Sequence, residues 1–169
     1  FMENKGNIIA NDISIGRIII LSSNLERCGV TNSIITRHNA LELCERLKKL
    51  NMKFDKILVD APCSGEGNLR CSPRTLLEWS EGLLESLGRK QKKILNSAVE
   101  LLKDDGEIVY STCTYAPEEN EMVIQDLLDK KDFKIVPIKL PLKTRNGLSE
   151  WKGNKFDKNM KDAVRIYHH

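Results

Sequence analysis

Residues 54–67 read FDKILVDAPCSGEG, and this stretch decides the fold of the 169-residue chain. Its apolar run, DKILVD at 55–60, predicts a strand that is covered on both faces, as in a parallel sheet. Asp60 ends the run, and Cys63 follows it in a loop of small residues and proline. A carboxylate and a thiol are therefore expected at the end of an internal strand.

Apolar segments and helical spacing alternate on both sides of this stretch. Further strands are expected over residues 6–12, 33–37, 106–111 and 133–138. The predicted helices comprise one capped by Ser14 and stopped at Gly29, a short one with leucines at 43, 47 and 50, a long region ending near Lys103, and one opened by Pro117. After Leu140 the chain reads as polar and irregular. This alternation predicts an α/β fold with a mostly parallel, doubly wound sheet.

Composition is that of an ordinary globular domain, with 40% apolar and 30% charged residues. No apolar run approaches the ~18 residues of a membrane span, and no secretory signal is visible. The five cysteines include no C-x-x-C pair, which argues against a disulfide framework and a metal site and favours a reducing, intracellular setting. The net charge of +3 and the basic clusters permit a nucleic-acid partner, although such clusters more often form a solvated helix face.

Polar side chains stand where several predicted strands end. Asp12, Asn39 and Asp60 do so, and so does Cys113 in YSTCTYAPEENE at 110–121. Ligands of open parallel sheets bind beyond the carboxyl ends of the strands. Any one of these residues could simply terminate a strand, but Asp12 also suits a ribose, whose two hydroxyls a carboxylate can accept. The sequence thus predicts a binding site at this edge.

The two thiols indicate covalent chemistry on a pyrimidine. Amino-group methyltransferases carry an Asp/Asn-Pro-Pro-aromatic stretch where this chain has DAPC, so that Cys63 replaces the aromatic residue. Carbon C5 of cytosine becomes nucleophilic when a thiolate adds to C6 and the charge that develops at N3 is neutralised. This requires a thiol of lowered pKa, a nearby carboxyl group and a route for elimination. Asp60 with either Cys63 or Cys113 meets these needs, whereas Cys28 and Cys44 read as small apolar side chains.

The same residues resemble a known family. FDKILVDAPCSG is similar to the signature of the RNA cytosine-C5 methyltransferases related to the nucleolar p120 (Nop2) and Sun (Fmu) proteins. GEGNLRCSP, EWS, YSTCTYAPEENE and AVRIYHH resemble further landmarks of that family. The resemblance implies a Rossmann-like class I methyltransferase fold, S-adenosylmethionine as cofactor, and transfer or ribosomal RNA as substrate. It implies that Cys113 attacks C6, that Cys63 assists elimination, and that Asp60 lies near the base and the methyl donor.

The resemblance also implies a set of cofactor residues. Asp12 would bind the ribose of S-adenosylmethionine, and Arg17 would brace that side of the site. Asn39 stands where the family usually has Asp, and its amide could still accept a hydrogen bond from the adenine amino group. Asp60 would border the same pocket.

Four basic residues are candidates for RNA contact. Arg70 and Arg74 lie in the loop after DAPCSGEG, close to where a flipped base would enter. Lys90 and Lys92 belong to GRKQKK, which is predicted to lie on an exposed helix. The expected partner is therefore RNA, without a membrane or a metal, and the expected state is a monomer.

Two expected family elements are missing from the sequence. No Gly-rich loop precedes the first strand, and FMENKG reads as the last turn of a helix that should follow such a loop. A Gly-Phe-Phe element is absent after His169, and His168-His169 are either native or the start of a purification tag. Residues 1–169 are thus expected to form a partial catalytic domain, truncated at both ends.

Two other functions remain open at the level of sequence. A noncatalytic RNA-binding or assembly module is favoured by the truncation and by Asn39, but retention of Asp60, Cys63 and Cys113 argues against it. A thiol-based redox protein would be expected to have a C-x-x-C pair. Within the family, GEGNLRCSP followed by EWS is most similar to the bacterial small-subunit and archaeal branches.

Overall fold

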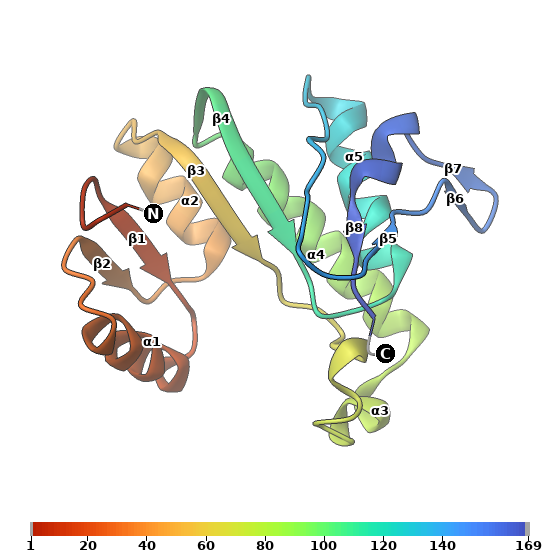
Figure 1. Ribbon diagram of the computed structural model, residues 1–169, viewed down its shortest axis with the longest axis horizontal. Coiled ribbons are helices and arrows are strands. Elements are labelled where there is room, and N and C mark those ends of the chain that lie inside the picture. Colours follow the sequence, from red (N-terminus) through yellow and green to blue (C-terminus); the bar gives the residue numbers. More distant parts are fainter. Residues whose placement is uncertain (1, 168–169) are drawn as a thin grey trace. The chain divides into compact units, whose positions relative to one another are not determined.

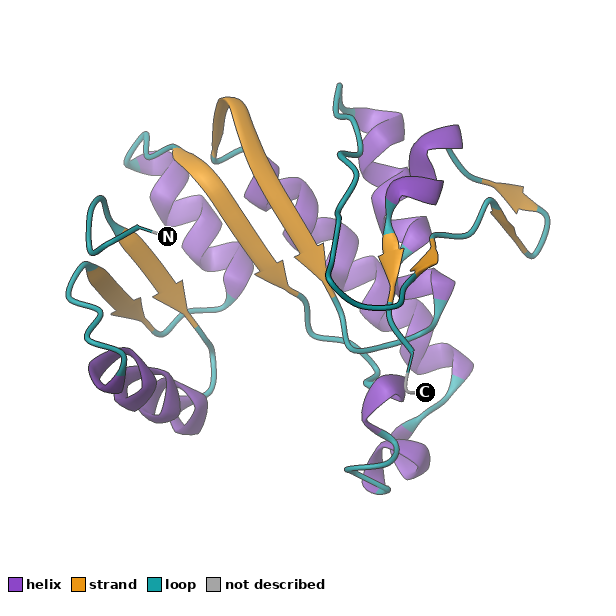
Figure 2. Cartoon of the chain, in the orientation of Figure 1, coloured by secondary structure: helices purple, strands orange, loops and turns teal. Residues whose placement is uncertain are grey.

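The computed structural model describes residues 2–167 and divides into two compact units, residues 1–53 and 54–169. His168 and His169, which close the AVRIYHH landmark, lie outside the described residues. Each unit contains a pair of parallel strands accompanied by helices (Figures 1 and 2). The parallel α/β character that the sequence predicts is therefore present in both units.

The first unit is a strand–helix–strand–helix segment. Its elements are β1 (Ile8–Asn11), α1 (Ile15–Arg27), β2 (Ser33–Thr36) and α2 (Ala40–Lys49). Strands β1 and β2 pair in parallel, with Asn11 opposite Thr36 at their carboxyl ends. The stretch FMENKG was predicted to be a helical turn, and this is wrong for its described part. Glu3 and Asn4 adopt left-handed backbone conformations, with φ of 50° and 57°, and form a turn before β1.

The second unit is built on a longer parallel pair, β3 (Phe54–Asp60) and β4 (Leu102–Ser111). They are joined by η1 (Glu66–Asn68), α3 (Arg74–Glu78) and α4 (Glu81–Val99). The predicted helical end near Lys103 is too late, because α4 ends at Val99 and Lys103 already belongs to β4. The register pairs Asp60 with Ser111. Both strands therefore end at the same level, and their following loops start side by side.

The chain after β4 departs further from the sequence-based expectation. Pro117 opens a 3-10 turn, η2 (Pro117–Glu119), and the helix α5 (Glu121–Lys130) follows it. No strand forms over residues 133–138, where the segment has no ladder partner among the described residues and Pro137 has no N–H to donate. The tail that was expected to be irregular contains β5 (Arg145–Asn146), β6 (Glu150–Trp151), β7 (Asn154–Lys155), η3 (Lys158–Asp162) and β8 (Val164–Arg165).

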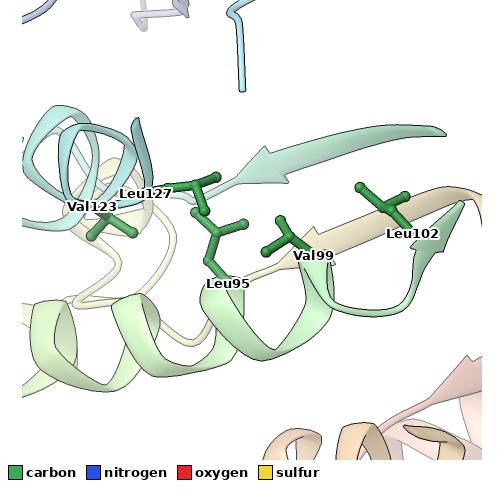
Figure 3. Close-up of a cluster of buried hydrophobic side chains, with 5 residues drawn as sticks. All are labelled: Leu95, Val99, Leu102, Val123 and Leu127. Carbon is green, nitrogen blue, oxygen red and sulfur yellow. The ribbon is translucent and has the colours of Figure 1, made fainter. Parts of the chain in front are cut away.

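The core of the second unit lies between α4, α5 and the strands. Leu95 and Val99 of α4 pack with Leu102 of β4 and with Val123 and Leu127 of α5 (Figure 3). Each such side chain contributes about 1.5–3 kcal/mol when it is fully buried. This cluster fixes α4 and α5 against the strands that carry the two thiol loops.

Gly88 allows α4 to approach η2 closely. A Cβ at this position would lie 2.8 Å from the carbonyl oxygen of Glu118. The helix starts at Ser80, whose hydroxyl accepts a hydrogen bond from the Leu83 N–H at 3.1 Å. The close packing brings the middle of α4 under the segment that follows Cys113.

One face of the β3–β4 pair is not covered by the helices of its own unit. Ile57 and Ile108 pack against the core cluster, but Leu58 and Val109 on the opposite face are 70% and 48% exposed. Within the second unit α4 and α5 thus cover only one face of β3, so this unit by itself supplies half of the cover that the sequence predicts. Among the described residues no helix is both long enough and apolar enough to cross a membrane.

Candidate catalytic site

The loops that follow β3 and β4 bring Cys63 and Cys113 together. Their Sγ atoms lie 3.2 Å apart, and both cysteines are free thiols. The backbone N–H of Cys113 also donates to the Sγ of Cys63 at 3.3 Å. The juxtaposition follows from the parallel register, since Asp60 and Ser111 are partners at the strand ends. The two thiols thus share one site, as the position of their motifs predicts.

Each loop supplies a carboxylate that holds the other loop. Glu66, on the Cys63 side, accepts hydrogen bonds from the Thr114 hydroxyl at 3.1 Å and the Tyr115 N–H at 3.0 Å. Glu119, on the Cys113 side, accepts from the N–H of Ser64 at 3.1 Å. These crosswise bonds fix the separation of the two sulfurs, although neither glutamate was predicted to belong to the site.

Glu119 is wholly buried, with 0% of its surface exposed. The side-chain amide of Gln91 on α4 donates to this carboxylate at 2.7 Å and to the carbonyl of Pro62 at 2.8 Å. A buried carboxylate is costly unless hydrogen bonds stabilise it, and here the donors come from Gln91 and Ser64. Gln91 therefore links the Cys63 loop to α4 as well as to Glu119.

Close backbone approach completes the link between the loops. The N–H of Gly67 donates to the carbonyl of Cys113 at 2.8 Å, and a Cβ on Gly67 would lie 2.9 Å from that oxygen. Only glycine fits this distance without a shift of the Cys113 backbone. The hydroxyls of Ser64 and Thr114 lie 2.9 Å apart and form a further hydrogen bond.

The environments of the two thiols differ. Burial raises the pKa of Cys63 to about 12, and the hydrogen bond with Cys113 acts in the same direction. Cys63 therefore keeps its proton near neutral pH and is not the thiol of lowered pKa that the chemistry requires. Cys113 is exposed, and its Sγ accepts a hydrogen bond from the side-chain amide of Asn68 at 3.3 Å. Asn68 was absent from the predicted site.

Asp60 stands at the end of β3 with an exposed side chain. Its Oδ1 accepts a long hydrogen bond of 3.4 Å from the hydroxyl of Ser111. The carboxylate is thus free to contact a ligand beyond the strand ends. Within residues 2–167, no group of three or more His, Cys, Asp or Glu side chains is arranged to hold a metal ion.

Three of the predicted cofactor residues, Asp12, Arg17 and Asn39, lie in the first unit, whereas Asp60 lies in the second. Asp12 follows β1, and its carboxylate accepts hydrogen bonds from the Ser14 N–H at 2.7 Å and from Arg17 at 3.1 Å. The pair of Asp12 and Arg17 is therefore present. Asn39 is the N-cap of α2, where its side-chain oxygen accepts from the Leu41 N–H at 3.0 Å. This capping bond was not expected from the sequence.

The predicted RNA-contact residues have unequal surroundings. Arg70 and Lys90 are exposed. Arg74 is also exposed, but it is paired with Glu78 at 2.6 Å within α3. Lys92 lies 4.0 Å from Asp126 and is only 31% exposed. The GRKQKK segment lies on α4 and is exposed at Arg89, Lys90 and Lys93, whereas Gln91 within it is wholly buried.

A cleft of about 400 Å³ borders the turn that carries Cys113 but includes neither cysteine. Aromatic and acidic side chains line it, among them Trp79, Tyr115, Trp151, Glu66 and Glu118. Two of these carboxylates are bonded to indole N–H groups, Glu66 to Trp79 at 2.8 Å and Glu118 to Trp151 at 2.9 Å. The residues that line the cleft pack beside the turn that carries Cys113.

Comparison with known proteins identifies the family. A family model described as 16S rRNA methyltransferase RsmB/F matches residues 1–167. The chain belongs to this family. The family resemblance stated from the motifs is therefore confirmed.

Individual RsmB/F-like relatives agree with this assignment. The chain is 40% identical over 99% of its length to the tRNA (cytosine(49)-C(5))-methyltransferase of Pyrococcus abyssi, of which it covers 52%. It is 44% identical over 76% of its length to the ribosomal RNA small subunit methyltransferase F of Aeromonas hydrophila, of which it covers 26%. The chain thus spans about half or less of the length of these relatives.

Solved structures confirm the Rossmann-like methyltransferase fold. A methyltransferase homolog protein from Pyrococcus horikoshii matches 98% of the chain with a TM-score of 0.82 at 35% identity, and the chain covers 50% of it. NSun6 from Pyrococcus horikoshii, solved with SFG, matches 83% of the chain with a TM-score of 0.66 at 34% identity, and the chain covers 35% of it.

Proposed function

We propose that this RsmB/F-family chain carries the chemistry of an RNA methyltransferase that modifies C5 of cytosine in transfer or ribosomal RNA. The observation that carries the proposal is the pair of free thiols, 3.2 Å apart, beyond the ends of adjacent parallel strands. The names of the relatives, a tRNA and a ribosomal RNA methyltransferase, support the substrate class. The five free cysteines support a reducing, cytoplasmic setting.

We propose S-adenosylmethionine as the cofactor. A relative solved with SFG, an analogue of S-adenosylmethionine, supports this choice. The residues of the first unit fit the group, because the Asp12 carboxylate ends β1, is oriented by the Ser14 N–H and Arg17, and retains acceptor capacity for ribose hydroxyls. Asn39 could accept from the adenine amino group only with the lone pair that its cap to Leu41 leaves unused.

In the proposed mechanism Cys113 is the nucleophile. The Cys113 thiolate adds to C6 of cytosine, so that an S–C6 bond forms and the electron pair of the C5–C6 double bond becomes available at C5. The negative charge that develops on the N3 side is neutralised by a proton that N3 takes from water and gives up again as C5 accepts the methyl group, and the Asp60 carboxylate accepts hydrogen bonds from N3–H and the N4 amino group. When bound, S-adenosylmethionine supplies the methyl group that C5 accepts.

Elimination restores the aromatic ring and frees the enzyme. The proton on C5 passes to water, its electron pair re-forms the C5–C6 double bond, and the S–C6 pair returns to Cys113. Cys63 still carries its proton at neutral pH, so its S–H can donate to the departing sulfur at the observed 3.2 Å. Cys63 would thus assist release by stabilising the leaving thiolate.

We assign RNA contact to the exposed basic side chains. Arg70 follows the Cys63 loop and is proposed to contact RNA near the entering base, with Arg74 beside it on α3. Lys90 and Lys92 on α4 are proposed as phosphate contacts, with Lys92 the weaker because it already faces Asp126. Arg70→Ala should reduce turnover, whereas Lys90→Ala should weaken binding to all RNA sequences and lower the salt dependence.

Bisulfite sequencing tests this function. The full-length protein is incubated with S-adenosylmethionine and transcripts of transfer RNA or small-subunit ribosomal RNA, and protected cytosines are mapped. The wild type should protect at least one cytosine, and Cys113→Ala should protect none. Tight RNA binding with no protected cytosine in any transcript or in total cellular RNA would instead support the noncatalytic module.

A further inference from the structure

Asn68 reaches the sulfur of Cys113 from the opposite loop. Its Nδ2 donates to the Cys113 Sγ at 3.3 Å. The other polar contact made by this sulfur is with Cys63 Sγ, at 3.2 Å. Asn68 lies in η1, five residues beyond Cys63 and outside the DAPC and STCT motifs that carry the proposed chemistry.

Carboxylates flank Cys113 on both sides along the chain. Asp60 is bonded to Ser111, and Glu66 is bonded to Thr114 and to the residue after it. Negative charges near a thiol oppose formation of the thiolate. Hydrogen-bond donors aimed at the sulfur act in the opposite direction, and the structure provides two of them, the amide of Asn68 and the S–H of Cys63.

The backbone holds Asn68 in place for this contact. Its N–H donates to the carbonyl of Gly65 at 2.8 Å, and its own carbonyl accepts from the Cys71 N–H at 2.9 Å. The preceding residue, Gly67, is bonded to the Cys113 carbonyl at 2.8 Å. The amide donor and the sulfur are therefore fixed on two segments that are themselves tied together.

We propose that Asn68 is a catalytic residue that stabilises the Cys113 thiolate through its side-chain N–H. The inference rests on the proposed function, in which Cys113 is the nucleophile. As the Cys113 thiol gives its proton to water, the amide N–H bonds to the anion that remains, and no electron transfer is involved. The Asn68 amide forms the same hydrogen bond again when the Cys113 sulfur leaves C6 as a thiolate. An amide does not titrate, so this support is present over the whole working pH range.

The test is the pH profile of alkylation at Cys113. The full-length protein is treated with iodoacetamide from about pH 6 to 11, and modification of each cysteine is read by peptide mass spectrometry. Asn68→Ala should move the midpoint of the Cys113 profile upward by up to ~1 pH unit, with the rate at the alkaline plateau little changed. Asn68→Asp, which places a carboxylate where the donor was, should move the midpoint further in the same direction.

Cys71 is the internal control, because it is exposed and lies three residues beyond Asn68. Its profile should stay the same in both variants. An unchanged Cys113 midpoint in Asn68→Ala, or an equal shift at Cys71, would overturn the proposal. The alkylation assay uses no RNA, so it separates this inference from the proposed function. RNA methylation by Cys113→Ala would defeat the proposed function and, with it, the catalytic role of Asn68.

Discussion

The loop that carries Cys63 and the turn that carries Cys113 place the same residue type in opposite environments. Both segments follow neighbouring parallel strands. Burial raises the pKa of Cys63 to about 12, whereas Cys113 is exposed and accepts a hydrogen bond from Asn68. Two cysteines at one edge of the sheet can therefore differ in function, with Cys63 keeping its proton and Cys113 proposed as the nucleophile. In the proposed mechanism, burial and hydrogen-bond donors rather than residue type distinguish the roles of the two cysteines.

The supports of the two segments differ in the same way. Glu119, which holds the Cys63 loop, is wholly buried, whereas Glu66, which holds the Cys113 turn, is half-buried. Water can reach the second set of bonds and substitute for a lost partner, but it cannot reach the first. The Cys63 loop should therefore be the more rigid and the less tolerant of substitution.

Removing each thiol in turn should give the largest contrast. Cys113→Ala should abolish methylation and also the covalent adduct with an RNA that contains fluorinated cytosine, because no sulfur remains to attack C6. Cys63→Ala should still allow attack and methyl transfer but stall release. A covalent RNA complex should then accumulate on denaturing electrophoresis and disappear in the double variant. If instead Cys113→Ala accumulated a covalent RNA complex and Cys63→Ala were inactive, Cys63 would be the nucleophile and Cys113 would assist release.

Alkylation of Cys63 should reveal how strongly the fold protects its proton. With a pKa raised from 9.0 to about 12, the native thiolate at about pH 8 is ~10³-fold scarcer than in an unfolded chain. Iodoacetamide should therefore modify native Cys63 at least ~100-fold more slowly than Cys63 in denaturant, allowing for partial exposure. The exposed Cys71 should change much less between the two conditions. Equal native and denatured rates at Cys63 would contradict the assigned environment.

Truncating the two glutamates tests the difference in support. Glu119→Ala leaves the buried Ser64 N–H without its carboxylate acceptor and the Gln91 amide with only the Pro62 carbonyl, and it should lower the free energy of unfolding by ~2–4 kcal/mol. Glu66→Ala, the matched change on the other loop, should cost only ~1 kcal/mol because water can replace the carboxylate. Urea unfolding of both variants measures the difference. A larger loss for Glu66→Ala would reverse the ranking.

Stability should fall at alkaline pH in part because burial raises the pKa of Tyr110, and the smallest expected effect is the further contribution of Cys63. Its pKa is higher in the folded state than the ordinary value of 9.0. Between about pH 9 and 12 the folded protein therefore keeps a proton that the unfolded chain has lost, so unfolding releases a proton and stability falls as pH rises. Cys63→Ala should flatten this decline in urea unfolding curves. Cys113→Ala serves as the control and should retain most of the Cys63 contribution, because burial, the main cause of the raised pKa, remains when the Cys113 hydrogen bond is lost.

The sequence by itself determined the parallel strand pattern and the meeting of the two thiols. The run ending at Asp60 is unambiguous because it is apolar and bounded by turn residues, and parallel strands bring their carboxyl ends to one edge. That argument needs no tertiary detail. It was enough to place Cys63 and Cys113 at one site and to connect their motifs with the correct family.

Predictions from the local sequence pattern were wrong where a strand depends on neighbouring strands or helices. The segment 133–138 has a strand-like composition, yet it pairs with no strand in the described chain. Leu58 belongs to an apolar run but lies on the face of β3 that the helices of its own unit do not cover. A strand requires a partner for its backbone groups, and a covered face requires a helix on that side. Neither can be read from the segment alone.

Only the tertiary structure decided how the site is held and which thiol keeps its proton. Asn68 meets Cys113 across 45 residues of sequence, and Glu119 meets Ser64 across 55. The pKa of Cys63 depends on burial beneath groups from both loops, which no local spacing encodes. The sequence determines which residues lie at the edge of the sheet, because strands have a regular backbone geometry that a local pattern of residues can predict. Solvation and donor contacts arise only when distant segments pack, so the fold alone decides how far each sulfur is buried and which donors reach it.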